Sequence, residues 1–171
     1  MQNITSAYAN KLLKSLEEDK TYWMNVEATS STYVVALNEE PVVPAYDYSK
    51  VADTIAEIDE KISIIKHALN LANATAKVQV GDQIMSVDMI LIRMAQLNKR
   101  KIILDRMRKQ LPKMREEHSS YLSRNAVPEY RYVNYDLDLV KQEYERISGK
   151  IMEMQMALDK YNQTETFEVV M

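Results

Sequence analysis

The sequence predicts a mainly α protein: an elongated antiparallel four-helix bundle or set of helical hairpins, with a small β-hairpin and a short C-terminal strand. Two observations carry this prediction. Apolar residues recur at unbroken three- and four-residue spacing along two segments, which is typical of a long helix packed along another helix. The 171 residues also include only two glycines, fewer than the turns of an all-β fold require. We therefore expect one helical domain over residues 1–171.

Each of the two apolar ladders has eight consecutive positions. The first comprises Val51, Ile55, Ile58, Ile62, Ile65, Leu69, Ala72 and Ala76. The second comprises Leu137, Val140, Tyr144, Ile147, Ile151, Met154, Leu158 and Tyr161. Helical residues at this spacing share one face, and bundles bury that face, so we interpret all of these side chains as core.

The N-terminal part is expected to hold one helix and an extended connection. The helix covers about residues 5–29 and presents one apolar face, formed by Ala9, Leu12, Leu16, Trp23 and Val26. Residues 32–48 contain Pro41, Pro44 and two pairs of valines, a composition that favours extended chain over helix.

A second helix carries the first ladder, from a cap at Ser49 to about residue 76, a length of about 40 Å. The alternating residues 78–84 surround Gly81-Asp82, which predicts a short hairpin compatible with a type II′ turn. Ser86 is expected to cap a third helix, with Asp88 in its first turn opposing the helix dipole.

The third helix should end near Pro112, because proline breaks or bends a helix. Its seven-residue spacing is set by Ile90, Leu97, Leu104 and Leu111, and we expect further apolar residues to add to the same core: Leu91, Met94, Ile102, Ile103 and Met107. Residues 129–135 alternate enough to form a short strand. Asp136 then caps a fourth helix that ends near residue 162, and the tail 166–171 is expected to be a strand or a docking arm.

Composition excludes several classes of site and location. The chain has no cysteine, which excludes disulfides, thiolate metal sites and cysteine nucleophiles. Its apolar stretches are far shorter than the roughly 20 residues that span a bilayer. No basic region followed by an apolar run opens the chain, so we expect no secretory signal and a cytoplasmic location.

Residues 99–115 form a basic segment with a net charge of +7 in a chain of net charge −3. A surface of this kind can bind the phosphates of nucleic acid or an anionic membrane. The candidate binding residues are Lys99, Arg100, Arg106, Arg108 and Lys109. The other interpretation is a solvated helix face whose charges pair with acids of neighbouring helices, namely Glu17, Glu18, Asp19, Glu143 and Glu145. A pI near 5.5 disfavours nucleic acid as a partner without excluding it.

Polar residues gather at three helix ends, where an antiparallel arrangement can bring two of the groups together. One group contains Asn70, Asn73 and Thr75, the second Asn134 and Asp136, and the third Asn162, Thr164 and Glu165. Such residues usually cap a helix or order a turn. The alternative is a small polar pocket at a bundle end, for which we name Asn70, Asn73, Thr75, Asn134 and Asp136.

No metal, cofactor or catalytic centre is predicted. His67 has no ligand-type neighbour on its helix, and His118 follows two glutamates in an expected loop. Glu57 and Glu60 lack the histidine of a di-iron motif. Met152, Met154 and Met156 alternate on a helix and cannot converge on a metal. The motifs of serine nucleophiles and of phosphate loops are absent, so we do not expect an enzyme.

Three segments resemble a bacterial family of uncharacterised, mainly helical proteins that is sometimes labelled septicolysin-like. They are residues 68–75 (ALNLANAT), residues 92–98 (IRMAQLN) and residues 132–136 (YVNYD), with a helix end at residues 161–165 (YNQTE). The resemblance covers about residues 12–165. The family's Arg-Asp pair is not kept in residues 92–98. The resemblance implies a helical, oligomeric protein without an assigned activity.

The methionine and tyrosine content of an elongated helical protein predicts a homo-oligomer. The expected contacts between copies are Tyr130, Tyr132 and Tyr135 of the tyrosine-rich segment and Phe167 and Val169 of the tail. The leading functional prediction is a self-assembling structural or interaction module without catalysis, whose partners are other copies of itself, with another protein as a further candidate partner. The alternative is a polyanion-binding protein that uses residues 99–115.

Overall fold

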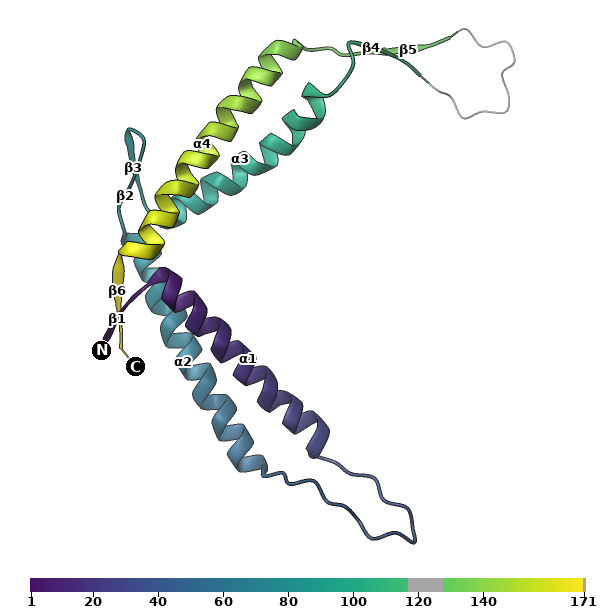
Figure 1. The fold of residues 1–171 in the computed structure, drawn as a ribbon, viewed down its shortest axis with the longest axis vertical. Helices are drawn as coiled ribbons and strands as arrows, with labels where there is room; N and C mark the ends of the chain where they lie inside the picture. Colours follow the sequence, from purple (N-terminus) through teal and green to yellow (C-terminus); the bar gives the residue numbers. More distant parts are fainter. Residues whose placement is uncertain (117–127, 171) are drawn as a thin grey trace.

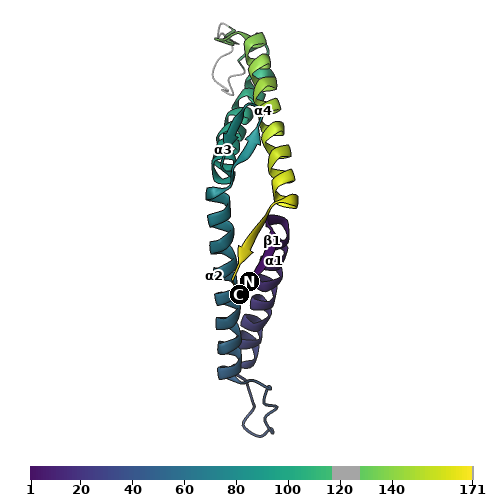
Figure 2. The same cartoon turned by 90° about the vertical axis from the view of Figure 1, so that its left-hand side faces the viewer.

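Two helical hairpins diverge from a common joint and give the molecule the shape of a V (Figure 1). The structure is a computed structural model that describes residues 1–116 and 128–170. We call the hairpin of α1 and α2 the first arm and that of α3 and α4 the second arm. Both views show slender arms, each one helix pair thick (Figures 1 and 2).

The first arm is built from α1 (Ser6–Ser30) and α2 (Tyr48–Thr75). The intervening residues 31–47 form no helix or strand and are mostly exposed, as their prolines predict. The arm's core combines residues from both helices with one residue from each chain end, and contains Ile4, Ala9, Leu13, Ile58, Ile62, Ile65 and Val169.

The second arm is built from α3 (Val87–Arg108) and α4 (Leu137–Thr164). Every position of the second ladder is buried or half-buried, which confirms that prediction. The arm holds two clusters of buried residues. The cluster near the joint contains Val78, Val80, Val87, Ile90, Met154 and Leu158, and the distal one Leu104, Val140 and Ile147.

Two small antiparallel ribbons form the joint. β1 (Gln2–Thr5) pairs with β6 (Thr166–Val169), so the two ends of the described chain lie together. β2 (Val78–Val80) pairs with β3 (Gln83–Met85) and confirms the predicted hairpin. Gly81 has a φ of +53° and no non-glycine residue described has a positive φ. This excludes a type I′ turn and agrees with type II′.

A third ribbon extends the tip of the second arm. β4 (Lys113–Arg115) pairs with β5 (Tyr130–Tyr132). The sequence predicts β5 and the C-terminal strand, but not their partners β4 and β1. Short strands carry little periodicity of their own, and each of these two depends on a partner far along the chain.

The helix caps differ from prediction at two of three places. Asp47, rather than Ser49, caps α2 and accepts a hydrogen bond from the backbone N–H of Lys50. Ser86 occupies the expected N-cap of α3, but its hydroxyl donates to the carboxylate of Asp88 instead of accepting from the helix. Asp136 caps α4 as predicted, and accepts from the N–H groups of Asp138 and Leu139.

The mainly α class and the helical hairpins are therefore confirmed, whereas the four helices do not converge into one bundle. Most contacts between helices lie within the pairs α1–α2 and α3–α4, and the arms touch only near the joint. Each helix consequently buries one face against one partner. The remaining faces are not covered within the described chain.

Candidate functional sites

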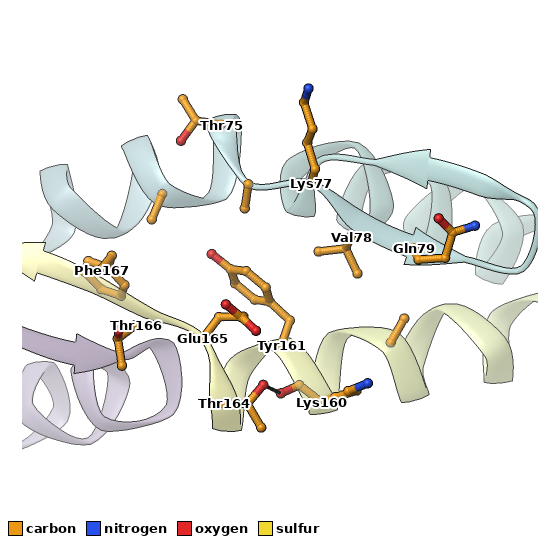
Figure 3. Close-up of a pocket in the computed structure, with 13 residues that line it drawn as sticks. Thr75, Lys77, Val78, Gln79, Lys160, Tyr161, Thr164, Glu165, Thr166 and Phe167 are labelled. Atoms are coloured by element: carbon orange, nitrogen blue, oxygen red, sulfur yellow. Dashed lines mark hydrogen bonds between the residues drawn. The ribbon is translucent and has the colours of Figure 1, made fainter.

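A cavity of about 460 Å³ lies at the joint, between the end of α2 and the end of α4 (Figure 3). Ala72, Ala76 and Ala157 contribute small apolar side chains to its walls, and Phe167 closes one end. Its position between the cores of the two arms explains the space, because Phe167 packs on the first core and Ala157 on the second.

Tyr161 is the largest side chain that enters this cavity, and the carboxylate of Glu165 lies beside it (Figure 3). Burial and the negative charge of Glu165 raise the pKa of the Tyr161 phenol. Lys77 and Lys160 also border the cavity, but their ammonium groups point away from its centre. The arrangement offers a small cavity of mixed polar and apolar lining, in which the Tyr161 hydroxyl and the Glu165 carboxylate lie side by side.

The structure brings together two of the three polar groups noted in the sequence. Thr75 from the end of α2 lines the joint cavity together with Thr164 and Glu165 from the end of α4. Asn70 and Asn73 precede it on α2 and are not among the cavity-lining residues. Asn134 and Asp136 lie at the opposite end of α4, at the tip of the second arm, so they share no pocket with Thr75.

The basic segment is partly neutralised within its own helix. Asp105 accepts hydrogen bonds from Lys109 Nζ at 2.5 Å and from Arg108 Nε at 2.9 Å. These two cations hold the pKa of the Asp105 carboxyl below its usual value. The predicted pairing with acids of α4 is present as weaker electrostatic attraction: the pKa of Glu143 is lowered mainly by its hydrogen bond from Arg146 and also by the charge of Arg100. The hydrogen-bonded and ion-paired partners of these acids are other residues. Glu17 pairs with Lys66, Glu18 with Lys14, and Glu143 with Arg146.

The basic segment also contacts tyrosine rings. Arg108 and Lys101 both lie over the ring of Tyr144 on α4, at 4.0 and 5.4 Å from its centre. A shallow groove of about 600 Å³ runs here, and four of its lining residues are basic: Lys101, Arg106, Arg108 and Lys109. Lys99 and Arg100 are exposed on the same helix outside this groove.

Metal binding finds no support in the part of the chain that is described, which contains no cluster of three potential ligands. His67 is exposed on α2. His118 lies outside the described residues. Met154 is core while Met152 and Met156 are each 67% exposed, so the three side chains diverge as the helical spacing predicts.

Three of the five predicted oligomer contacts are used inside the chain. Val169 is completely buried in the core of the first arm, and Phe167 packs against the same core. Tyr135 donates a hydrogen bond to the carbonyl oxygen of Met107 and packs on the distal core of the second arm. Val169 is therefore not accessible to a second copy, whereas Phe167 and Tyr135 are half-buried. Tyr130 and Tyr132 are exposed, with Lys113 lying over both rings.

The prediction that Leu91, Ile102 and Ile103 add to the core of the third helix is wrong. They lie on the side of α3 opposite its buried residues Ile90 and Leu104, which we call the open face. Four large aliphatic side chains on it, Leu91, Ile92, Ile102 and Ile103, are each between 48% and 58% exposed. The face is completed by Asp88, Ala95, Lys99 and Arg106. The sequence contains evidence of this second apolar face. Consecutive apolar residues on a helix point to different sides, so part of the run Ile90-Leu-Ile92 and of the pair Ile102-Ile103 lies outside the single face that α4 covers.

Among the helices described, none is both long enough and apolar enough to cross a membrane. Neither the protein-family models nor the curated proteins compared with this chain gave a match. A solved structure does match: the crystal structure of a functionally unknown conserved protein from Corynebacterium diphtheriae. The TM-score is 0.66 at 12% identity, covering 98% of this chain and 100% of that one. At this identity the likeness shows that the whole fold is shared, and nothing about activity.

Proposed function

We propose that this protein is a self-assembling structural module whose second arm associates with a second copy of the chain. The observation that carries the proposal is the open face of α3, with four aliphatic side chains about half exposed on a single 22-residue helix. Exposed apolar residues grouped in this way mark interaction surfaces in soluble proteins. The proposed role involves no catalytic step.

A second copy is the partner that the architecture favours. Each arm is one pair of antiparallel helices, which leaves the open face of α3 about half exposed. The second arm of another molecule can cover this face by two-fold symmetry, and a dimer with two-fold symmetry is the commonest form of homo-oligomer. The open face also carries a carboxylate near one end and a guanidinium near the other, charges that a second copy can match.

Light scattering after size-exclusion chromatography tests the proposal. We expect an oligomer at tens of micromolar protein that persists in 1 M salt, because apolar contacts are not screened. Ile92→Glu should dissociate it. Met156→Glu is the matched control, since it places the same charge at an exposed apolar position on the side of α4 away from its apolar ladder. A wild-type monomer at these concentrations would refute the proposal.

Polyanion binding is a second candidate, favoured by the basic groove over Lys101, Arg106, Arg108 and Lys109. Asp105 already pairs with two of these side chains, which lowers the charge available for phosphates. If this candidate holds, the protein binds heparin or single-stranded DNA with an affinity that falls steeply with salt. Arg106→Glu should then weaken binding and lower its dependence on salt, and Lys61→Glu on α2 should do neither. Salt-independent oligomers that do not bind heparin would favour the first proposal alone.

A further inference from the structure

The open face of α3 is symmetric about Leu97 in the kind of residue it carries. Four pairs of its residues lie at equal distances on either side of Leu97: Asp88 with Arg106, Leu91 with Ile103, Ile92 with Ile102, and Ala95 with Lys99. The outer pair is an acid and a base, the next two pairs are aliphatic, and the inner pair combines a small residue with a long one.

All eight residues belong to one side of the helix. Successive residues of an α-helix are rotated by about 100°, which places these eight within about 120° of one another and opposite Ile90, Leu97 and Leu104. Ile90 and Leu104 are buried against the second arm's own core, and Leu97 packs on the same core. Seven of the eight open-face residues are exposed, and Asp88 is half-exposed.

We propose that two copies associate through α3 and its symmetry mate in an antiparallel register centred on Leu97. This inference rests on the proposed function, which it makes specific. In an antiparallel helix pair with two-fold symmetry, residues equally distant from the centre lie at the same level on opposite helices. Ile92 then meets Ile102 of the second copy, Leu91 meets Ile103, and Asp88 meets Arg106. Each of these contacts occurs twice.

Charge explains why the pairing is antiparallel. The C-terminal half of α3 begins the basic segment with Lys99, Arg100 and Lys101, whereas residues 87–98 contain one acid and one base, Asp88 and Arg93. A parallel pair would place two basic halves side by side, and like charges at an interface cost free energy. The antiparallel pair places each basic half beside a neutral half, and it also opposes the two helix dipoles.

The inner pair suits close approach of the two helices. Ala95 is the smallest side chain on the open face and lies one turn from Lys99. The methyl group of Ala95 leaves room for the apolar stem of the opposing Lys99, whose ammonium group can reach water at the rim of the interface.

Reversal of the charge at each of the two paired positions, Asp88 and Arg106, gives a test in which a mixture of two variants is compared with each variant alone. Asp88→Arg alone opposes arginine to Arg106 in both contacts, and Arg106→Asp alone opposes aspartate to Asp88. We expect each variant to weaken the dimer about tenfold. A 1:1 mixture of the two variants should form a heterodimer of wild-type strength, because every contact then joins opposite charges. Circular dichroism confirms that each variant is folded.

Cysteine cross-linking reads the register directly, because the chain has no native cysteine. In the proposed register two copies of residue 95 are offset by about 6 Å along the helix axes and two copies of residue 103 by about 18 Å. Ala95→Cys should therefore be linked into a dimer by a short bismaleimide that spans about 8 Å, and Ile103→Cys should not. A parallel pair would cross-link both.

The outcomes separate this inference from the proposed function. A wild-type dimer that cross-links through neither position, or whose charge variants do not rescue one another in the mixture, overturns the α3 register and leaves self-assembly standing. A wild-type protein that is monomeric overturns both. Cross-linking at residue 95 alone, with recovery of the dimer in the mixture, establishes the register.

Discussion

The guanidinium carbon of Arg108 lies 4.0 Å from the centre of the Tyr144 ring and so joins the end of α3 to the side of α4. The same guanidinium donates a hydrogen bond from Nε to Asp105 at 2.9 Å, and its Nη2 forms an ion pair with that carboxylate at 2.7 Å, which fixes its orientation over the ring. A cation held over an aromatic face is attracted by the electrons of the ring. The contact closes the distal end of the second arm, beyond the buried side chain of Leu104.

Asp105→Asn is expected to make the stability of the protein less dependent on pH in the acid range. Lys109 and Arg108 hold the pKa of Asp105 below its unfolded value of about 3.9. A depressed folded-state pKa means that the carboxylate stabilises the fold above that unfolded value, and that this stability is lost as pH falls through the folded-state pKa. Urea unfolding from pH 7 to about pH 2 measures the difference between variant and wild type, which should shrink on acidification.

The control for that experiment is Asp53→Asn, which removes one negative charge at an exposed position on α2. An identical pH dependence in the two variants would show that net charge, rather than the contacts of Asp105, is responsible.

The two glycines are expected to respond to alanine in opposite directions. Gly81 has a φ of +53°, and an added Cβ would lie 2.6 Å from Oε1 of Glu153. The glutamate side chain can move, but the backbone strain remains, so Gly81→Ala should cost about 1 kcal/mol. Gly149 lies within α4 with nothing within 4 Å of an added Cβ, and Gly149→Ala should stabilise by about 1 kcal/mol. Thermal unfolding of both variants measures these changes in stability. A lower unfolding temperature for Gly149→Ala would be inconsistent with the open space at that position.

Removal of the carboxylate of Asp47 is expected to destabilise α2, whereas Ser49→Ala is not. The side chain of Asp47 accepts a hydrogen bond from the N–H of Lys50, and the loss of such a cap costs about 1 kcal/mol. Asp47→Ala and Ser49→Ala, compared by chemical denaturation, distinguish the two capping positions. A larger loss of stability in Ser49→Ala than in Asp47→Ala would contradict the assignment of the cap to Asp47.

A cavity in one arm should leave the other arm protected. Ile65 is fully buried in the first core, and Ile65→Ala is expected to cost about 2–5 kcal/mol. Because the buried clusters of the arms are separate, amide hydrogen exchange should accelerate along α1 and α2 and remain slow in α4 around Ile147. Uniform acceleration throughout the chain would mean that the arms unfold as a single unit.

The residues that the sequence analysis identified well are those whose structure is decided locally. Val140, Ile147, Met154 and Leu158 are all buried, because three- and four-residue spacing places them on one face of a helix regardless of what covers it. The N-cap of α4 at Asp136 is local in the same sense, since its carboxylate accepts from amides two and three residues ahead.

Relationships between distant residues were not predictable from spacing. An apolar stripe has the same pattern whether its helix joins one partner or three, so the ladders could not show that the arms diverge. Val169 looked available for a second copy because the sequence does not reveal β1, against which β6 pairs. Acids of other helices were the predicted partners of the basic segment, whereas Arg108 pairs with Asp105, three residues earlier on the same helix. The joint cavity likewise depends on where α2 and α4 end relative to one another.

The pairing of β1 with β6 has a consequence for synthesis on the ribosome. The first arm is encoded almost entirely by the first half of this chain, but its core includes Val169, which is translated long after the other residues of that core. Domains usually fold as their residues emerge, from the N-terminus onward. Here Val169 can pack against Ile4 and Ala9 only after about 160 further residues have been added. At about 5–20 residues per second, this synthesis takes roughly 8–30 seconds. During that interval the nascent first arm has an incomplete core that a chaperone can recognise, and the core is completed only after Val169 has been synthesised.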